Sequence, residues 1–107
     1  PEAVLDPESL LLASDQASHI DASDPVIDYL YRLVQATRDQ TGQGLSPRAA
    51  LAILQAAKAL AWLRRDPVVL PDDIKKAFTH AVPHRLLAVE DPEETTLAIL
   101  KSTPIVA

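Results

Sequence analysis

The sequence predicts an all-α fold, a small bundle of about five helices. Apolar residues make up 48% of the 107 residues, and many of them are Ala and Leu, which are strong helix formers. Only two glycines are present, and apolar residues recur at helical spacing along several segments. A chain of this length supports one modest hydrophobic core but not two. We therefore expect residues 1–107 to form one domain.

Prolines predict where the helices begin. Five of the nine prolines follow a plausible boundary residue and precede a helical pattern. Proline suits the first helical position because its missing N–H would be unpaired there, and Asp or Ser before it caps the first turn. One boundary residue, Leu70, cannot cap, although Asp72 and Asp73 favour the helix dipole there. The five pairs are Asp6-Pro7, Asp24-Pro25, Ser46-Pro47, Leu70-Pro71 and Asp91-Pro92.

The helices are expected over residues 7–17, 25–38, 47–64, 71–81 and 92–101. The third of these is apolar on nearly all sides, so it is predicted to lie in the middle of the bundle. A short extended segment is expected near residues 67–70, either as a short strand or as a packed connector. Two charged stretches are interpreted as solvated helix ends, namely Arg64-Arg65-Asp66 and residues 90–94.

Composition and charge exclude several functions. Ten Lys and Arg against fifteen Asp and Glu give a net charge of −5, which leaves no obvious basic face for nucleic acid. No cysteine is present, so disulfides and thiolate metal sites are excluded, and no apolar run reaches membrane-spanning length. We therefore expect neither nucleic acid nor a membrane as a partner, and a cytoplasmic location. The chain begins at Pro1 without a Met, which suggests a piece of a longer protein.

Arg48 is the first candidate for a binding role. It occupies the second position of the helix over residues 47–64, after a loop that holds both glycines. A cation there opposes the helix dipole by about 0.3–1 kcal/mol, but a guanidinium beside a helix N-terminus is also suited to bind an anion. On charge placement alone, a solvated or Asp-paired surface Arg is the favoured interpretation. Three small or neutral residues share its face, and they suit an approaching protein surface and internal packing equally well: Ala52, Gln55 and Ala59.

Other candidate sites are weaker. His80 and His84 are four residues apart, a spacing that two metal ligands on one helix would have. Pro83 lies between them and no third ligand is near, so we predict an ordinary surface or hydrogen-bonding role and no metal site. The sequence has no Gly-x-x-x-x-Gly-Lys phosphate loop, no Gly-x-Ser-x-Gly motif and no Cys nucleophile. We therefore do not expect these 107 residues to be catalytic on their own.

A resemblance to a known family covers roughly residues 19–107 in consistent order. The sensor-2 helix of MoxR-family AAA+ ATPases resembles the stretch Gly44-Leu45-Ser46-Pro47-Arg48-Ala49-Ala50-Leu51 and its continuation to Ala61. Matches also lie on both sides of that helix. They are Asp28-Tyr29-Leu30, Thr37-Arg38, Arg65-Asp66, Val69-Leu70-Pro71-Asp72-Asp73-Ile74, His84-Arg85-Leu86 and residues 97–106. An ordered set of this kind is more specific than any single short motif.

The resemblance implies a fold and a role. A lid of this family is a small helical bundle that follows an α/β nucleotide-binding core. The family's sensor-2 Arg, here Arg48, touches the γ-phosphate of bound ATP, and Ser46 and Pro47 are carried over as neighbouring cofactor-binding positions. The implied parent is an ATP hydrolase that uses ATP and Mg²⁺. The lid alone lacks the phosphate loop, so it is expected to bind neither tightly.

The resemblance also implies partners. They are the ATPase core of the same chain, the other subunits of a ring that is usually hexameric, and proteins with von Willebrand factor A domains. Members of the family act as chaperone-like ATPases in the maturation of other proteins. Two departures from the family pattern, Leu70 for a capping Thr and Pro67 for Tyr, bear on the packing of the helix over residues 71–81.

Two other interpretations of the sequence stay open. One is a free-standing helical protein-interaction module, and the other is the lid of a magnesium-chelatase-like AAA+ protein. A phosphate loop encoded upstream in the same reading frame would exclude the first of them. The motifs of the nucleotide-binding core would distinguish the second from a MoxR-type lid.

Overall fold

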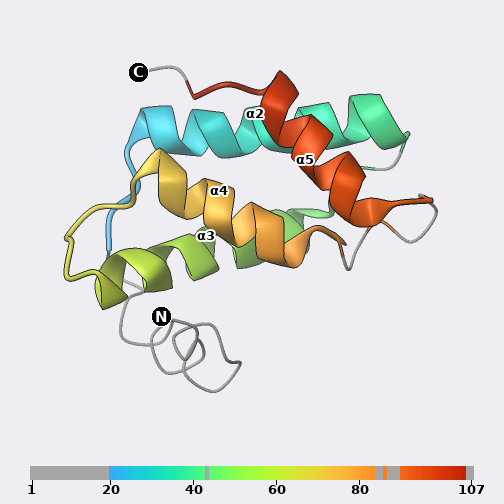
Figure 1. Ribbon diagram of the computed structural model, residues 1–107. Coiled ribbons are helices and arrows are strands. Elements are labelled where there is room, and N and C mark those ends of the chain that lie inside the picture. Colours follow the sequence, from blue (N-terminus) through green and yellow to red (C-terminus); the bar gives the residue numbers. More distant parts are fainter. Residues whose placement is uncertain (1–19, 43, 84–85, 87–89, 106–107) are drawn as a thin grey trace.

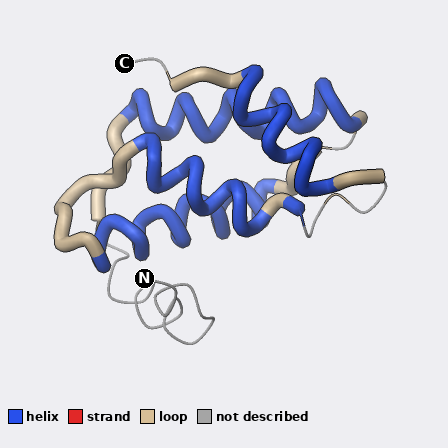
Figure 2. The backbone as a smooth tube through the Cα atoms, viewed as in Figure 1, coloured by secondary structure: helices blue, strands red, loops and turns tan. Residues whose placement is uncertain are grey.

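Four helices make up most of the described structure. The computed structural model describes residues 20–42, 44–83, 86 and 90–105. The helices are α2 (Asp24–Thr41), α3 (Pro47–Leu63), α4 (Pro71–Ala81) and α5 (Pro92–Ser102). They are joined by loops, and no strand occurs in the described part of the chain (Figure 2). The all-helical prediction is therefore confirmed for these residues, whereas the helix predicted over residues 7–17 lies outside them.

The helix starts follow the prolines closely. α3, α4 and α5 begin at Pro47, Pro71 and Pro92, as predicted. α2 begins one residue earlier than predicted, so Asp24 lies inside its first turn and Ser23 takes the capping position. The Ser23 side chain makes no capping hydrogen bond. The prediction that Asp24 caps this helix is therefore wrong.

α2 also continues three residues beyond its predicted end. It stops at Gly42, whose φ of 72° lies in the left-handed region, and the Gly42 N–H donates to the carbonyl oxygen of Arg38 at 2.8 Å. Glycine adopts this conformation at little cost because it has no Cβ, so it commonly ends helices. Thr41, the last helical residue, donates its hydroxyl to the carbonyl oxygen of Thr37 at 2.7 Å.

The core lies around α4, which packs against each of the other three described helices (Figure 1). Its inward side chains, Ile74 and Phe78, are fully buried, and they lie in one apolar cluster with residues of α2, α3 and α5. Among the described helices, α2 and α4 each pack against the other three, whereas α3 packs mainly against α4 and less against α2. Contrary to the prediction, α3 is therefore not the most central of these four helices. Much of the apolar surface of α3 belongs to alanines, which bury little area, and its Leu51 stays 52% exposed.

The connector between α3 and α4 is extended and packed, as predicted. Val68 forms an isolated parallel bridge with Asp21, where the Val69 N–H donates to the Asp21 carbonyl oxygen at 2.9 Å. Val69 itself is buried in the core cluster. The connector therefore holds the chain that enters α2 against the segment that leaves α3. It does this as a single bridge and not as a full strand.

One of the two charged stretches predicted as solvated helix ends, at the end of α3, is exposed at Arg64 and Arg65 but also holds ion pairs. Asp73, only 2% exposed, accepts hydrogen bonds from the guanidinium of Arg64 and from the Leu70 N–H, the latter at 2.8 Å. Arg64 also pairs with Asp66 at 3.2 Å. The hydrogen bond to Asp73 is the main cause that raises the pKa of Arg64. The pKa of Asp66 is lowered, first by the N–H of Val68 and then by Arg64.

This group of charges joins the end of α3 to the start of α4. It also forms one half of a capping box, because the Asp73 carboxylate reaches back from inside the helix and accepts the Leu70 N–H, although the Leu70 side chain offers no acceptor in return. A second pair of contacts holds the end of α5 against α2. The Arg32 guanidinium donates to the Pro104 carbonyl oxygen at 2.9 Å, and the Gln40 amide donates to the Ser102 hydroxyl at 2.8 Å.

Candidate functional site

Arg48 lies at the second position of α3 with its side chain exposed. It makes no hydrogen bond or ion pair with any residue that the structure describes. Two other arginines of the chain are engaged: Arg32 pairs with Asp28 at 3.1 Å, and Arg64 pairs with Asp66 and Asp73. The Asp-paired interpretation of Arg48 is therefore not what the structure shows within the described residues. None of the described residues therefore neutralises its guanidinium.

The first turn of α3 is arranged around this side chain. The Ser46 hydroxyl accepts the Ala49 N–H at 3.0 Å, and the Ser46 carbonyl oxygen accepts the Ala50 N–H at 3.0 Å. Pro47 has no N–H to offer. Within the described residues, the backbone N–H of Arg48 has no acceptor. The helix end presents one N–H and one guanidinium from the same residue.

The predicted roles of Ser46 and Pro47 become clearer from this geometry. The Ser46 oxygen is already used as the helix cap, so its place is to hold the first turn in shape. Pro47 fixes the backbone angle at the first helical position and removes a competing donor. Both residues shape the helix end, while Arg48 supplies the groups that can bind an anion.

Ser46→Ala is expected to lower the free energy of unfolding of the 107-residue chain by about 1 kcal/mol, because the Ala49 N–H loses its acceptor. Unfolding in urea, followed by circular dichroism, measures the difference. Ser23→Ala is the matched control, since Ser23 caps α2 without a side-chain hydrogen bond and should change little. Equal losses in the two variants would mean that the Ser46 hydrogen bond does not hold the turn.

The loop before α3 contains a close contact that the sequence did not predict. A Cβ atom added to Gly44 would lie 3.0 Å from Nε and 3.0 Å from a terminal nitrogen of Arg38. Arg38 is exposed and lies in the last turn of α2. The sequence showed it only as part of the Thr37-Arg38 match, with no role attached. The available signal was a glycine close after an arginine that ends a helix.

The face of α3 that carries Arg48 is open at its start and packed toward its end. Ala52 is half-buried and Gln55 is exposed, whereas Ala59 is completely buried. Leu51, one turn after Arg48, is also exposed. Internal packing therefore accounts for the end of this face, and the approach of another protein surface beside Arg48 stays a prediction.

Comparison with known protein families shows which family the chain belongs to. Residues 34–103 match the AAA lid domain family, a stretch that begins within α2 and holds α3, α4 and α5. The chain belongs to this family. The matched range includes Arg38, Gly44 and the whole first turn of α3.

Two relatives narrow the lid domain's position within the family. Chaperone MoxR1 of Mycobacterium tuberculosis is 32% identical over 99 residues, which are 82% of this chain and 26% of MoxR1. The uncharacterized protein YeaC of Bacillus subtilis is 32% identical over 88 residues, which are 80% of this chain and 28% of YeaC. The resemblance to MoxR-family AAA+ ATPases is confirmed. The lid domain thus spans little more than a quarter of each relative, and no solved structure matches it significantly.

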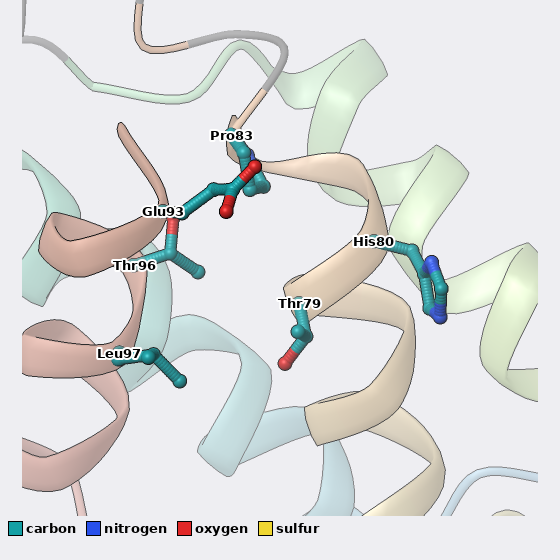
Figure 3. A pocket seen from close by; sticks show the side chains of 6 residues that line it. All are labelled: Thr79, His80, Pro83, Glu93, Thr96 and Leu97. Atoms are coloured by element: carbon teal, nitrogen blue, oxygen red, sulfur yellow. The ribbon is translucent and has the colours of Figure 1, made fainter. Parts of the chain in front are cut away.

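The structure adds little support for the other predicted sites. His80 is exposed on α4, and His84 lies outside the described residues. A pocket of about 320 Å³ between α4 and α5 is lined by His80, but in Figure 3 its ring points away from Glu93 and the other side chains of α5. The described residues hold no group of three His, Asp or Glu side chains arranged for a metal. None of the described helices is long and apolar enough to cross a bilayer.

Proposed function

We propose that this lid domain senses bound ATP through Arg48 as part of a longer MoxR-family AAA+ ATPase. The observation that carries the proposal is the exposed Arg48, which makes no hydrogen bond or ion pair within the described residues, at the capped start of α3. Its guanidinium is permanently charged and matches phosphate oxygens as a planar fork, and its backbone N–H adds a second donor at the positive end of the helix dipole. The guanidinium and the N–H would both stabilise the negative charge of a terminal phosphate.

The lid supplies only part of such a site. Among the described residues, Arg48 fits a phosphate group, whereas no cluster of carboxylates is arranged to hold Mg²⁺. ATP, once bound to the nucleotide-binding core, would provide the γ-phosphate as the anion. Arg48 would bind and orient that phosphate from the lid side, stabilise the charge that develops on it during hydrolysis, and so couple its presence to lid movement.

The wider assembly is part of the same proposal. The lid's partner within the chain is the ATPase core, and the family resemblance favours a hexameric ring. MoxR1 is named a chaperone. By extension, the parent of this lid would remodel or mature partner proteins, including proteins with von Willebrand factor A domains, in the cytoplasm.

The direct test is ATP hydrolysis by the full-length ATPase with Arg48→Ala. A large loss of turnover with a folded lid supports the proposal, and wild-type turnover excludes Arg48 as the sensor.

The 107-residue chain itself is expected to bind ATP weakly, with a dissociation constant of about 1 mM or higher. One guanidinium and one helix end replace neither the phosphate loop nor the Mg²⁺ ligands of the core. Isothermal titration calorimetry with Mg-ATP measures the affinity, and Arg48→Ala in the same chain is the control for any residual heat. A micromolar affinity would show that the lid holds a complete nucleotide site, which contradicts the division of the site between lid and core.

A further inference from the structure

We propose that Arg38 is a positioning residue for Arg48, because its guanidinium, packed on Gly44, sets the course of the loop that leads into α3. The inference rests on the proposed function, since it assigns a second residue to the same nucleotide-sensing site. Nothing in the family match assigns a role to the contact.

The two glycines of the loop are glycines for different reasons. Gly42 has a φ of 72°, and a Cβ added there would meet nothing within 4 Å. Its backbone conformation therefore favours glycine. Gly44 has no such conformation, but a Cβ added there would lie 3.0 Å from two guanidinium nitrogens of Arg38 and 3.5 Å from its Cζ. A side chain at position 44 would therefore require the Arg38 guanidinium to move by a few tenths of an ångström.

The backbone of Arg38 is held in place at the end of α2. Its carbonyl oxygen accepts the Gly42 N–H at 2.8 Å, so its backbone is part of the α2 end cap. The preceding residue, Thr37, is completely buried and donates its hydroxyl to the Leu33 carbonyl oxygen at 2.8 Å. This turn of α2 is thereby fixed to the core. The Arg38 side chain makes no hydrogen bond or ion pair with described residues, so the packing on Gly44 is its main described contact.

Gly44 transmits its position to Arg48 through a short piece of chain. It lies two residues before Ser46, whose extended backbone (φ −67°, ψ 158°) and side-chain cap start the helix. A displacement of Gly44 by a few tenths of an ångström therefore moves the cap and the first turn with it. Because hydrogen bonds weaken steeply with distance and angle, such a shift at Arg48 weakens its hydrogen bonds to a phosphate. A misplacement of about 1 Å in a catalytic group costs on the order of 100-fold in rate.

The decisive experiment is a double-mutant cycle in the full-length ATPase. Arg38→Ala and Gly44→Ala are each made alone and together with Arg48→Ala, and kcat and KM for ATP are measured. Each single variant is expected to lower kcat by about tenfold, with a smaller change in KM. In the Arg48→Ala background neither should lower kcat by more than about twofold, because a residue that acts through Arg48 has nothing left to position.

Gly44→Ala is the informative partner of Arg38→Ala. It keeps every charge and changes only the packing, so a loss in kcat in this variant reports position and not electrostatics. Arg38→Gln, which is neutral but retains most of the stem, is the second variant. Thermal unfolding of the 107-residue chain should shift by no more than about 4 °C for Arg38→Ala and Arg38→Gln, since the side chain is exposed.

The outcomes separate the two proposals. Wild-type turnover for Arg38→Ala overturns the positioning role while Arg48 keeps its own. A full tenfold loss for Arg38→Ala in the Arg48→Ala background also overturns it, because Arg38 would then act independently, for example by direct contact with a phosphate. Wild-type turnover for Arg48→Ala overturns the proposed function itself.

Discussion

Replacing Arg48 with Ala in the full-length ATPase is expected to lower kcat for ATP hydrolysis by about 100- to 1000-fold. This is the usual cost of removing one preorganised donor from a developing oxyanion. The lid should stay folded, because the Arg48 side chain is exposed and makes no hydrogen bond or ion pair with the described residues. Steady-state kinetics with purified protein, together with circular dichroism of the lid, measures both effects. KM should change less than kcat if the contact strengthens in the transition state.

The matched control is Arg65→Ala. Arg65 is also exposed, and it lies just past the other end of α3. Its φ is 63°, and no other described non-glycine residue has a positive φ. Its removal should leave turnover within about twofold of wild type, as for other surface substitutions. Arg48→Lys should give an intermediate rate, since Lys keeps the charge but loses the planar fork. If Arg65→Ala and Arg48→Ala lose the same activity, the loss does not come from a specific contact at the start of α3.

Most helix boundaries could be predicted from the sequence because their causes are local. A proline at the first position acts within one turn, as does a Ser or Asp before it, so the starts at Pro47 and Pro92 were predictable. The start at Pro71 was predictable from the proline and the acidic residues that follow it. The end of α2 was not. The polar residues after Arg38 favour a loop by composition, but the left-handed conformation of Gly42 allows the helix to continue up to it.

The candidate site shows a similar division. Arg48 could be singled out only through the ordered resemblance, because its charge placement alone favoured an ordinary surface residue. The Arg38 contact with Gly44 could not be predicted, since it depends on how the loop returns past the last turn of α2. The pairing of Arg64 with Asp73 was missed for the same reason. Local rules place Arg64 at a solvated helix end and Asp73 at a helix dipole, and only the approach of α3 to α4 brings the two charges together.

That pairing gives the largest expected effect on stability. Asp73→Ala should lower the free energy of unfolding of the 107-residue chain by about 2–3 kcal/mol, because the Leu70 N–H and the Arg64 guanidinium both lose an acceptor. The loss should fall short of the roughly 3–5 kcal/mol typical of a broken buried ion pair. The reason is that the Arg64 side chain is 38% exposed and can turn toward water. Urea unfolding, followed by circular dichroism, measures the loss.

Asp72→Ala separates the pairing from the helix dipole. Asp72 lies beside Asp73 in the first turn of α4 and has the same charge, but it is exposed. Its removal costs only the dipole interaction, about 0.3–1 kcal/mol. Arg64→Ala should approach the cost of Asp73→Ala, since it leaves a carboxylate that is 2% exposed without its cation. If Asp72→Ala destabilises the chain as much as Asp73→Ala does, the Asp73 carboxylate contributes only its charge near the helix dipole. Its hydrogen bonds to Arg64 and Leu70 then add nothing, and apolar packing alone holds α3 against α4.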